Sequence, residues 1–391
     1  METAAKEILK IDKANWTPVK FGDVVFEPKE NAKDIYNEGI EHVVGLEHID
    51  SENIHLTRSG KLEETTTFSK KFKKGDVLFG RRRAYLKKAA LASFDGICSG
   101  DITVFRAKKN ILPELLPFVV NNEKFFDYAI KHSAGGLSPR VKFKDLANYE
   151  FFLPPKAEQA SLAELLWAMD EVIERERGVL ERLNIHNRSK KKELLTPEEM
   201  KNWKFEPLKN VFIKITTKNK SQSCKNVLTI SANYGLINQE EYFKRSVASK
   251  DLSNYYLLQR GDFAYNKSYS DGYPAGAIKV LNRYNEGVVS PLYICFRSKL
   301  KSDFNMYYEQ LFDFGFLNGK ILSIAKEGAR NHGLLNVAGG DFFELKIPIP
   351  PVSYLNKVIP ILKTLDSRKI DVESKISSSQ ALLKSLINHA F

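Results

Sequence analysis

Several short motifs of this 391-residue sequence occur twice, about 190 residues apart. The paired motifs are Asn15-Trp16 and Asn202-Trp203, Gly75-Asp76 and Gly261-Asp262, GICSGDITVFR (96–106) and GVVSPLYICFR (287–297), and FFLPP (151–155) and IPIPP (347–351). Solenoid repeats recur every 20–50 residues or so, so a period this long indicates a duplicated domain. The separations drift only from 186 to 196 residues, which indicates that the two copies differ by loop insertions.

Each copy combines strand-like and helix-like patterns. Residues 96–106 and 287–297 are rich in the β-branched and aromatic residues that strands favour. Residues 111–132 and 302–325 carry apolar side chains three and four positions apart, which indicates helices. Two earlier strand-like segments are VVGLEHID (43–50) and NVLTISANYGLI (226–237). We therefore predict an α+β fold in which each copy is a globular domain, with helices packed on a twisted sheet.

A long helical pattern follows the double proline that ends each copy. Apolar residues in these patterns recur at alternating steps of four and three, with polar interruptions, as in a coiled coil. The apolar positions predicted to form an interface between the helices are Leu162, Leu166, Met169, Ile173, Leu180, Leu183, Leu362, Leu365, Val372, Ile376, Leu383 and Leu386. Two helices that each bury one stripe should pack on one another or on a shared partner. The alternative is that each helix caps its own domain.

The chain therefore divides into four predicted segments. They are a first globular domain (1–155), a central helical region (156–200), a second globular domain (201–351) and a C-terminal helical region (352–391). Roughly 40 helical residues extend about 60 Å, which is enough to hold two domains apart. Pro360 should start or kink the second helix, because proline lacks an amide hydrogen and clashes with the preceding turn.

The charge balance points to an anionic partner. A formal net charge of +12 favours nucleic acid as that partner, although a merely basic soluble protein is the alternative. No apolar stretch approaches the length of a membrane span, and the N-terminus does not have the pattern of a signal peptide. Cys98, Cys224 and Cys295 are scattered, which excludes a disulfide framework and a zinc ribbon. We expect a cytoplasmic protein.

The sequence lacks the motifs of the common catalytic sites. It contains no phosphate-binding P-loop, no dinucleotide-binding G-x-G-x-x-G and no Asp/Asn-Pro-Pro-aromatic tetrapeptide of the kind that amino-methyltransferases use. Its seven histidines show no metal-ligand spacing. Asp341 and Glu344 with Lys346 resemble a nuclease cluster, but alternation within a strand explains them more simply. We therefore expect no catalytic residues, no bound metal and no cofactor in this chain.

Polar loops follow a predicted strand in each copy, and their chemistry differs. In the first copy, arginine side chains can clamp phosphates or pair with a guanine edge, and lysines can contact phosphates. In the second copy, an asparagine can pair with adenine, a lysine with guanine or phosphate, and a tyrosine can pack on the backbone. The predicted DNA-binding residues of these loops are Arg81, Arg82, Arg83, Lys87 and Lys88 in the first copy, and Asn266, Lys267, Tyr269 and Tyr273 in the second. A later loop in each copy, 133–142 and 327–336, adds Arg140 in the first and Arg330, Asn331 and His332 in the second.

The alternative interpretation of each charged residue is a solvated surface position. As a set, however, one scaffold with two unlike loops predicts recognition of two different short sequences.

In their order and their duplication, these blocks resemble the DNA-specificity (S) subunits of type I restriction–modification systems. The likeness covers nearly the whole chain and is carried by VVGLEHID, KKGDVLFGRRRAYLKKAAL (73–91), GICSGDITVFR, FFLPPKAEQASLAELLWAMD (151–170), VLTISANYGLINQEEY (227–242), YYLLQRGDFAYNKSYSDG (255–272), GAIKV (276–280) and GVVSPLYICFR. One departure is that the second copy has Tyr354 and Leu355 where the first has Glu158 and Gln159.

The resemblance implies two target-recognition domains that each read one half of a bipartite, asymmetric site in double-stranded DNA. It also implies that two long helices, packed as an antiparallel coiled coil, separate the domains and dock two methyltransferase (M) subunits. S-adenosylmethionine would act in the M subunits, and ATP and Mg²⁺ in restriction/translocase (R) subunits. One alternative is the specificity subunit of a bipartite type II enzyme, and a less favoured one is a chain with its own nuclease or methyltransferase activity.

Overall fold

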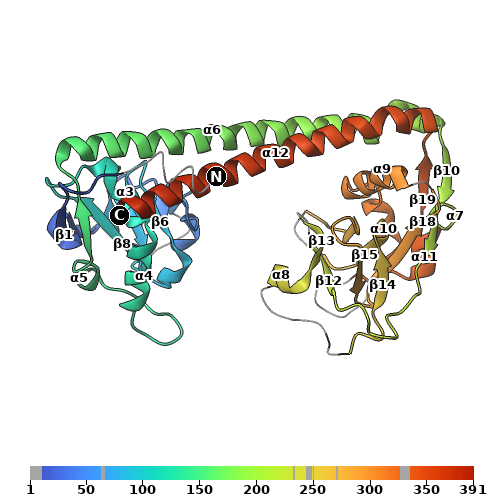
Figure 1. Ribbon diagram of the computed structural model, residues 1–391, viewed down its shortest axis with the longest axis horizontal. Coiled ribbons are helices and arrows are strands. Elements are labelled where there is room, and N and C mark those ends of the chain that lie inside the picture. The colour runs from blue at the N-terminus through green and yellow to red at the C-terminus, as the bar shows by residue number, and fades with distance from the viewer. Residues whose placement is uncertain are drawn as a thin grey trace. The chain divides into compact units, whose positions relative to one another are not determined.

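The computed structural model describes residues 11–62, 67–231, 234–243, 249, 251–269, 272–300, 302–325 and 335–391. The chain divides into two compact units, of which unit 1 comprises residues 1–179 and 372–391 and unit 2 comprises residues 180–371 (Figure 1). Both units contain sheets and helices, which confirms the predicted α+β fold. Among the helices of the described residues, none is both long and apolar enough to cross a membrane.

Unit 1 is built on short strands, which pair antiparallel except for the parallel pair of β3 and β7. Its main sheet has the order β2 (Val25–Phe26), β8 (Ile102–Ala107), β5 (Val77–Gly80) and β6 (Ala89–Leu91). The other pairings are β3 (Val43–Val44), β7 (Gly96–Cys98) and β4 (Lys70–Phe72) in one sheet, and β1 (Thr17–Lys20) with β9 (Glu150–Leu153). The helical elements are α2 (Phe21–Val24), η1 (Leu46–His48), η3 (Ala84–Leu86), η4 (Pro113–Leu115), α3 (Leu116–Val120), α4 (Glu123–Lys131), α5 (Phe143–Leu146) and the first part of α6 (Lys156–Leu195).

Unit 2 repeats this plan. Its main sheet has the order β11 (Phe212–Lys214), β18 (Ile294–Ser298), β15 (Phe263–Asn266) and β16 (Ala277–Val280). The other pairs are β12 (Leu228–Ser231) with β13 (Gly235–Asn238), β14 (Tyr256–Gln259) with β17 (Glu286–Val289), and β10 (Lys204–Pro207) with β19 (Lys346–Ile349). The helical elements are η5 (Glu198–Asn202), α7 (Leu208–Val211), α8 (Gln239–Phe243), α9 (Ser302–Asp313), α10 (Asn318–Ile324), α11 (Gly339–Glu344) and the first part of α12 (Val352–Ala390).

The two sheets share their core packing as well as their strand order. In unit 1 the rings of Phe79 and Phe105 stack across β5 and β8, with centroids 5.4 Å apart. In unit 2 the rings of Phe263 and Phe296 stack across β15 and β18 at 5.1 Å. Phe105 and Phe296 occupy the same position of the repeated motifs, whereas their ring partners lie two positions apart in the repeat. The shared strand order, with an aromatic stack between the same two strands, is what a duplicated domain produces and supports the predicted duplication.

The predicted helices at 111–132 and 302–325 are each interrupted. Asn122 ends the first run and caps α4, because its side-chain oxygen accepts a hydrogen bond from Phe125 N at 3.1 Å. Gly315 separates α9 from α10, with a φ of +92° that a residue with a side chain rarely adopts. The strand-like segment 43–50 is also shorter than predicted, because η1 follows β3 after one residue.

The helices α6 and α12 each contribute to both cores. In unit 1, Leu166 from the first half of α6 and Leu386 from the last turns of α12 lie in one hydrophobic core. In unit 2, Leu194 from the end of α6 lies in one core with Val358 and Leu362 from the start of α12. The start of each helix therefore shares a core with the end of the other, which identifies the pair as antiparallel, as predicted.

Pro360 lies inside the second helix. Because α12 begins at Val352, the proline is in its third turn, so the expectation that it starts the helix is wrong. Val358, Ile359 and Leu362 on either side of it are buried in the core of unit 2. We infer that this packing retains the helical turn although the proline cannot donate a backbone hydrogen bond.

Candidate nucleic-acid interface

A Gly-Asp turn precedes the strand that leads into the polar loop of unit 1. Gly75 has a φ of +92°, the left-handed conformation that favours glycine. The Asp76 carboxylate accepts a hydrogen bond from Lys73 N at 2.7 Å and two from the Arg106 guanidinium on β8, both at 2.7 Å. This buried ion pair ties the turn to the neighbouring strand and so fixes the direction in which β5 enters its loop.

Unit 2 contains the same turn. Gly261 has a φ of +89°, and the Asp262 carboxylate accepts from Gln259 N at 2.7 Å. The guanidinium of Arg297 on β18 donates two hydrogen bonds to Asp262, at 2.6 and 2.7 Å. The repeated Gly-Asp therefore belongs to the scaffold, and the difference between the copies begins in the loop that follows the strand.

Two loops that are distant in the sequence meet beyond β5. Arg81 O accepts a hydrogen bond from Val141 N at 3.1 Å, and Arg83 N donates to Pro139 O at 2.8 Å. The corresponding contact recurs in unit 2, where Lys267 O accepts from Leu335 N at 3.0 Å. In each unit the polar loop after the strand is therefore hydrogen-bonded to a later segment of the chain, at Pro139 and Val141 in unit 1 and at Leu335 in unit 2.

Arg82, Asp101 and Arg140 form an ionic cluster between the paired loops of unit 1. Arg140 Nε and Arg82 Nη1 lie 2.7 and 3.2 Å from the two oxygens of Asp101. Partial burial raises the pKa of Asp101, but hydrogen bonds from Arg140 and Arg82 outweigh this effect and lower the pKa overall. Arg82 also donates to Ser138 Oγ at 3.1 Å. Both arginines therefore brace the loops, and their prediction as DNA contacts stays a prediction.

The neighbouring arginines differ in their freedom. Arg81 is partly buried and donates from Nε to Val141 O at 3.1 Å. Arg83 is exposed and has a left-handed backbone, with a φ of +54°. Within the described residues its guanidinium has no hydrogen bond or ion pair to the protein. Arg83 is therefore the member of the arginine run best placed to meet a ligand from solvent.

Both predicted lysine contacts have internal partners. Lys87 forms an ion pair with Glu123 and lies 3.7 Å from Glu52. Lys88 donates from Nζ to Leu46 O at 2.7 Å. A phosphate would have to compete with these partners, so the assignment of both lysines to DNA stays a prediction.

The polar loop of unit 2 presents a different set of groups. Asn266 Oδ1 accepts from Ser268 N at 3.1 Å, and the side chain of Lys267 is partly exposed. Tyr269 is 63% exposed, whereas the Tyr273 hydroxyl donates to Asp313 at 2.7 Å on α9. The loop therefore offers amide, amine and phenol groups where unit 1 offers guanidinium groups. The predicted residues Arg330, Asn331 and His332 lie outside the described residues.

The residues predicted for the helix interface line the packed sides of α6 and α12. Those that are buried are Leu162, Leu166, Ile173, Leu362, Leu365, Ile376, Leu383 and Leu386, and those that are partly buried are Met169, Leu180, Leu183 and Val372.

The polar contacts between the helices, two of which lie at polar interruptions of the heptad pattern, were not predicted. Ser379 Oγ donates to Glu176 at 3.1 Å in unit 1, and Asn187 Nδ2 donates to Leu365 O at 3.1 Å in unit 2. Glu176, Asn187 and Ser379 are polar residues that interrupt the heptad pattern, and these interruptions could have indicated both contacts.

Comparison with known proteins finds a family match in the first half of the chain. Residues 13–184 match the family of the type I restriction modification DNA specificity domain. These residues, which make up less than half of the chain, are named the specificity domain after this match. The specificity subunit of the type I restriction enzyme EcoDI from Escherichia coli is 30% identical over 128 residues, which is 32% of this chain and 28% of that subunit. The predicted resemblance to type I specificity subunits is thereby confirmed, although the aligned part spans under a third of that relative.

Two solved structures resemble the chain over nearly its whole length. A chain from a structure of the assembly and conformational transition of the type I R-M system has a TM-score of 0.56 at 18% identity, covering 97% of this chain and 99% of that one. The S subunit of a type I restriction–modification system from M. genitalium has a TM-score of 0.54 at 14% identity, covering 98% of each chain. At these identities the likeness shows that the fold is shared.

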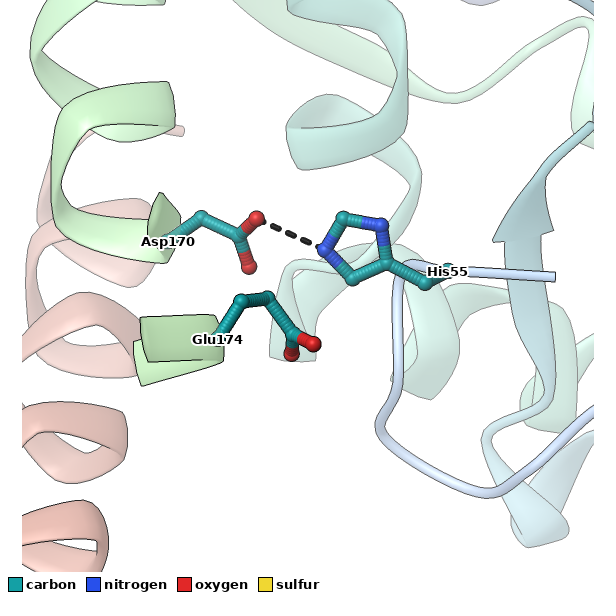
Figure 2. A group of neighbouring side chains, drawn as sticks. All are labelled: His55, Asp170 and Glu174. Atoms are coloured by element: carbon teal, nitrogen blue, oxygen red, sulfur yellow. Dashed lines mark hydrogen bonds and ion pairs between the residues drawn. The ribbon is translucent and has the colours of Figure 1, made fainter. Parts of the chain in front are cut away.

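The specificity domain also brings a histidine and two carboxylates together beside α6 (Figure 2). His55 Nε2 lies 2.7 Å from Asp170, and the ligand atoms of His55, Asp170 and Glu174 all lie within 4.8 Å of one another. Glu174 is also paired with Arg177 at 2.7 Å. Each carboxylate therefore has a partner within the protein, and we interpret the group as an ionic clip between a loop and the helix. The expected absence of a bound metal stays a prediction.

Replacing His55 by glutamine is expected to remove a pH-dependent part of the stability of the specificity domain. The hydrogen bond to Asp170 raises the pKa of His55, and partial burial opposes this effect. A raised pKa means that the folded state binds the proton of His55 more tightly than the unfolded state does. The contribution of protonated His55 to the unfolding free energy is therefore complete below the pKa of histidine in the unfolded chain, about 6.5. It is lost as the pH rises through the higher folded value.

Denaturant unfolding of wild type and His55→Gln between about pH 5.5 and 9 measures this contribution. We expect a difference in unfolding free energy of about 1 kcal/mol at the acidic end, shrinking toward the alkaline end. A difference that stays constant over the range would contradict the role of the charged histidine.

Proposed function

We propose that this chain is a non-catalytic subunit that binds double-stranded DNA by sequence and selects the site for a type I restriction–modification complex, which acts in defence against phage. The observation that carries the proposal is the repetition of one scaffold with two unlike loops. The same Gly-Asp turn supports β5 and β15, yet Arg81 to Arg83 follow the first strand, whereas the second ends at Asn266 and is followed by Lys267 to Tyr269. Each unit would therefore read one half of a bipartite, asymmetric site.

We propose that α6 and α12 set the spacing of the half-sites and dock two methyltransferase subunits. Both helices are continuous and contribute to both cores, which supports a role in spacing. Outside the packed stripe of α6, Leu165, Val172 and Val179 remain 38%, 49% and 44% exposed at intervals of seven residues. An exposed apolar stripe with heptad spacing supports a helical partner.

The reactions would belong to partner subunits. S-adenosylmethionine would be used by the methyltransferase subunits, and ATP and Mg²⁺ by the restriction/translocase subunits. Glu344, the carboxylate considered for a nuclease site, pairs with Lys209 at 2.6 Å at the exposed surface, which favours a structural role for it. The functional division into residues 1–155, 156–200, 201–351 and 352–391 is part of this proposal.

Selection from a random pool of DNA duplexes tests the proposal. The full-length chain, alone and with its methyltransferase partner, is expected to enrich two unlike short sequences separated by a fixed number of unspecified base pairs. The chain alone should neither methylate nor cleave the enriched duplex in the presence of S-adenosylmethionine, ATP and Mg²⁺. Enrichment of one continuous motif, or activity of the chain alone, would contradict the proposal.

Arg83→Gln is expected to weaken binding of the enriched duplex by roughly tenfold without changing stability, because the side chain is exposed and contacts solvent. Arg82→Gln is the matched control, and it should lower the unfolding free energy by about 1–2 kcal/mol because Arg82 braces Asp101 and Ser138. Fluorescence anisotropy and thermal unfolding measure the two effects. Unchanged affinity in Arg83→Gln would place this loop outside the interface.

A further inference from the structure

Leu137 is 98% exposed, the highest value among the large hydrophobic residues that the structure describes. It lies in the loop between α4 and α5, which projects from the rest of unit 1 in Figure 1. Gly135, with a φ of +118°, and Gly136 precede it, and Ser138 and Pro139 follow it. The apolar side chain therefore stands at a narrow tip that the rest of the unit does not cover.

The base of this loop is fixed by hydrogen bonds. Ala134 N and Arg140 O are 3.0 Å apart, and Arg140 N and Ala134 O are 2.9 Å apart, so the two residues close a short loop around Leu137. Arg83 N donates to Pro139 O, and Arg82 donates to Ser138 Oγ. The base of the loop is therefore held in a defined position, so only the few residues of the tip have to be ordered when a ligand binds.

The charged side chains around the base of the loop are mostly cationic, which favours an anionic partner. The guanidinium groups of Arg82, Arg83 and Arg140 belong to the base of the loop or to the residues bonded to it, and Asp101 neutralises part of this charge. A single exposed leucine is common on protein surfaces and needs no partner. Duplex DNA carries anionic phosphates on its outside and stacked, apolar base faces inside. Arginines at the base of the loop can contact the phosphates, and a leucine at its tip can contact the bases.

We propose that Leu137 inserts between adjacent base pairs of the bound duplex and partly unstacks that step. The inference rests on the proposed function and adds a mode of recognition to it. Apolar wedges of this kind open a base step while arginines hold the flanking phosphates. Because pyrimidine–purine steps are the easiest to unstack, the wedge selects such a step through its deformability and needs no hydrogen bond to a base edge.

The test uses the duplex enriched by the wild-type chain, with 2-aminopurine placed in turn at each position of the half-site read by unit 1. Wild-type protein should raise the fluorescence at one step, and Leu137→Ser should abolish that rise and weaken binding by roughly tenfold. Leu137→Met should retain both properties, because it keeps an apolar wedge of similar length. Leu382→Ser, which changes a leucine that is 40% exposed on α12 in the same unit, is the matched control and should behave as wild type.

Equal affinity and an equal fluorescence profile in Leu137→Ser and wild type would overturn the wedge and leave the proposed function standing. Failure of the wild-type chain to enrich any sequence would overturn both, so the two failures are distinguishable. Leu137→Ser should melt within about 1 °C of wild type, because surface substitutions of this kind scarcely change stability.

Discussion

A chain in which residues 194–365 replace residues 1–169 is expected to recognise the second half-site twice and to lose the first half-site entirely. The boundaries follow the packing of unit 2, because Leu194 and Leu362 belong to its core and must move with it. Leu365 then takes the seam position of Met169, so the apolar pattern of the following helix continues. If each unit reads its own half-site, the exchange replaces recognition of the first half-site and leaves recognition of the second unchanged.

Selection of this variant from a random duplex pool measures the outcome. The unaltered second half-site serves as the internal control for folding and binding. Retention of the first half-site by a chain that lacks residues 1–169 would show that recognition is not divided between the units.

Asp76→Ala is expected to lower the unfolding free energy of unit 1 by about 3 kcal/mol, the scale for removing one partner of a buried ion pair. Asp76 is 2% exposed, and its bonds to Arg106 hold the pKa of that guanidinium above its usual value. Asp262→Ala in unit 2 should cost less, about 2 kcal/mol, because the side chain of Arg297 is 47% exposed and its charge is better solvated.

The control for both variants is Asp50→Ala. Asp50 pairs with Arg58 at the surface, where both side chains are about half exposed, so its loss should cost under about 1 kcal/mol. Denaturant unfolding of the three variants gives the order. An equal loss of unfolding free energy in Asp50→Ala and Asp76→Ala would contradict the role of the Gly-Asp turn as a structural anchor.

The duplication, the antiparallel helices and the α+β character of the fold were all predictable, because each leaves a periodic or repeated pattern in the sequence. The partners of the repeated aspartates were within reach as well. Arg106 and Arg297 end the aligned motifs GICSGDITVFR and GVVSPLYICFR, and each pairs with the aspartate of its own copy. Two charged positions that repeat together, one acidic and one basic, indicate a conserved ion pair of the scaffold.

The departure at Tyr354 also has a structural explanation. In unit 1, Trp16 Nε1 donates to Glu158 at 2.9 Å. In unit 2, the rings of Trp203 and Tyr354 pack edge to face with centroids 4.8 Å apart. The repeated tryptophan therefore keeps a partner at the same helical position, as a hydrogen bond in one copy and as a ring contact in the other.

The contacts between the polar loops within each unit could not be predicted from the sequence. Arg82 contacts Asp101 and Ser138, which lie 19 and 56 residues further along the chain, and no local sequence pattern encodes such contacts. Interruptions within helices were also missed, because Asn122 acts through a cap and Gly315 through its backbone conformation, while apolar periodicity continues across both. Sequence patterns therefore located the polar loops but did not assign the partners of their side chains.

Insertion of one heptad into each helix tests whether the helix pair fixes the spacing of the two half-sites. Seven residues placed after Val179 in α6 and seven after Asp371 in α12 fall at the division between the units, so both cores stay intact. Seven residues add about 10 Å of helix, or about three base pairs of DNA. If the helices set the spacing, the enriched site should keep both half-site sequences, with a spacer about three base pairs longer. An unchanged spacer would contradict this role of the helices.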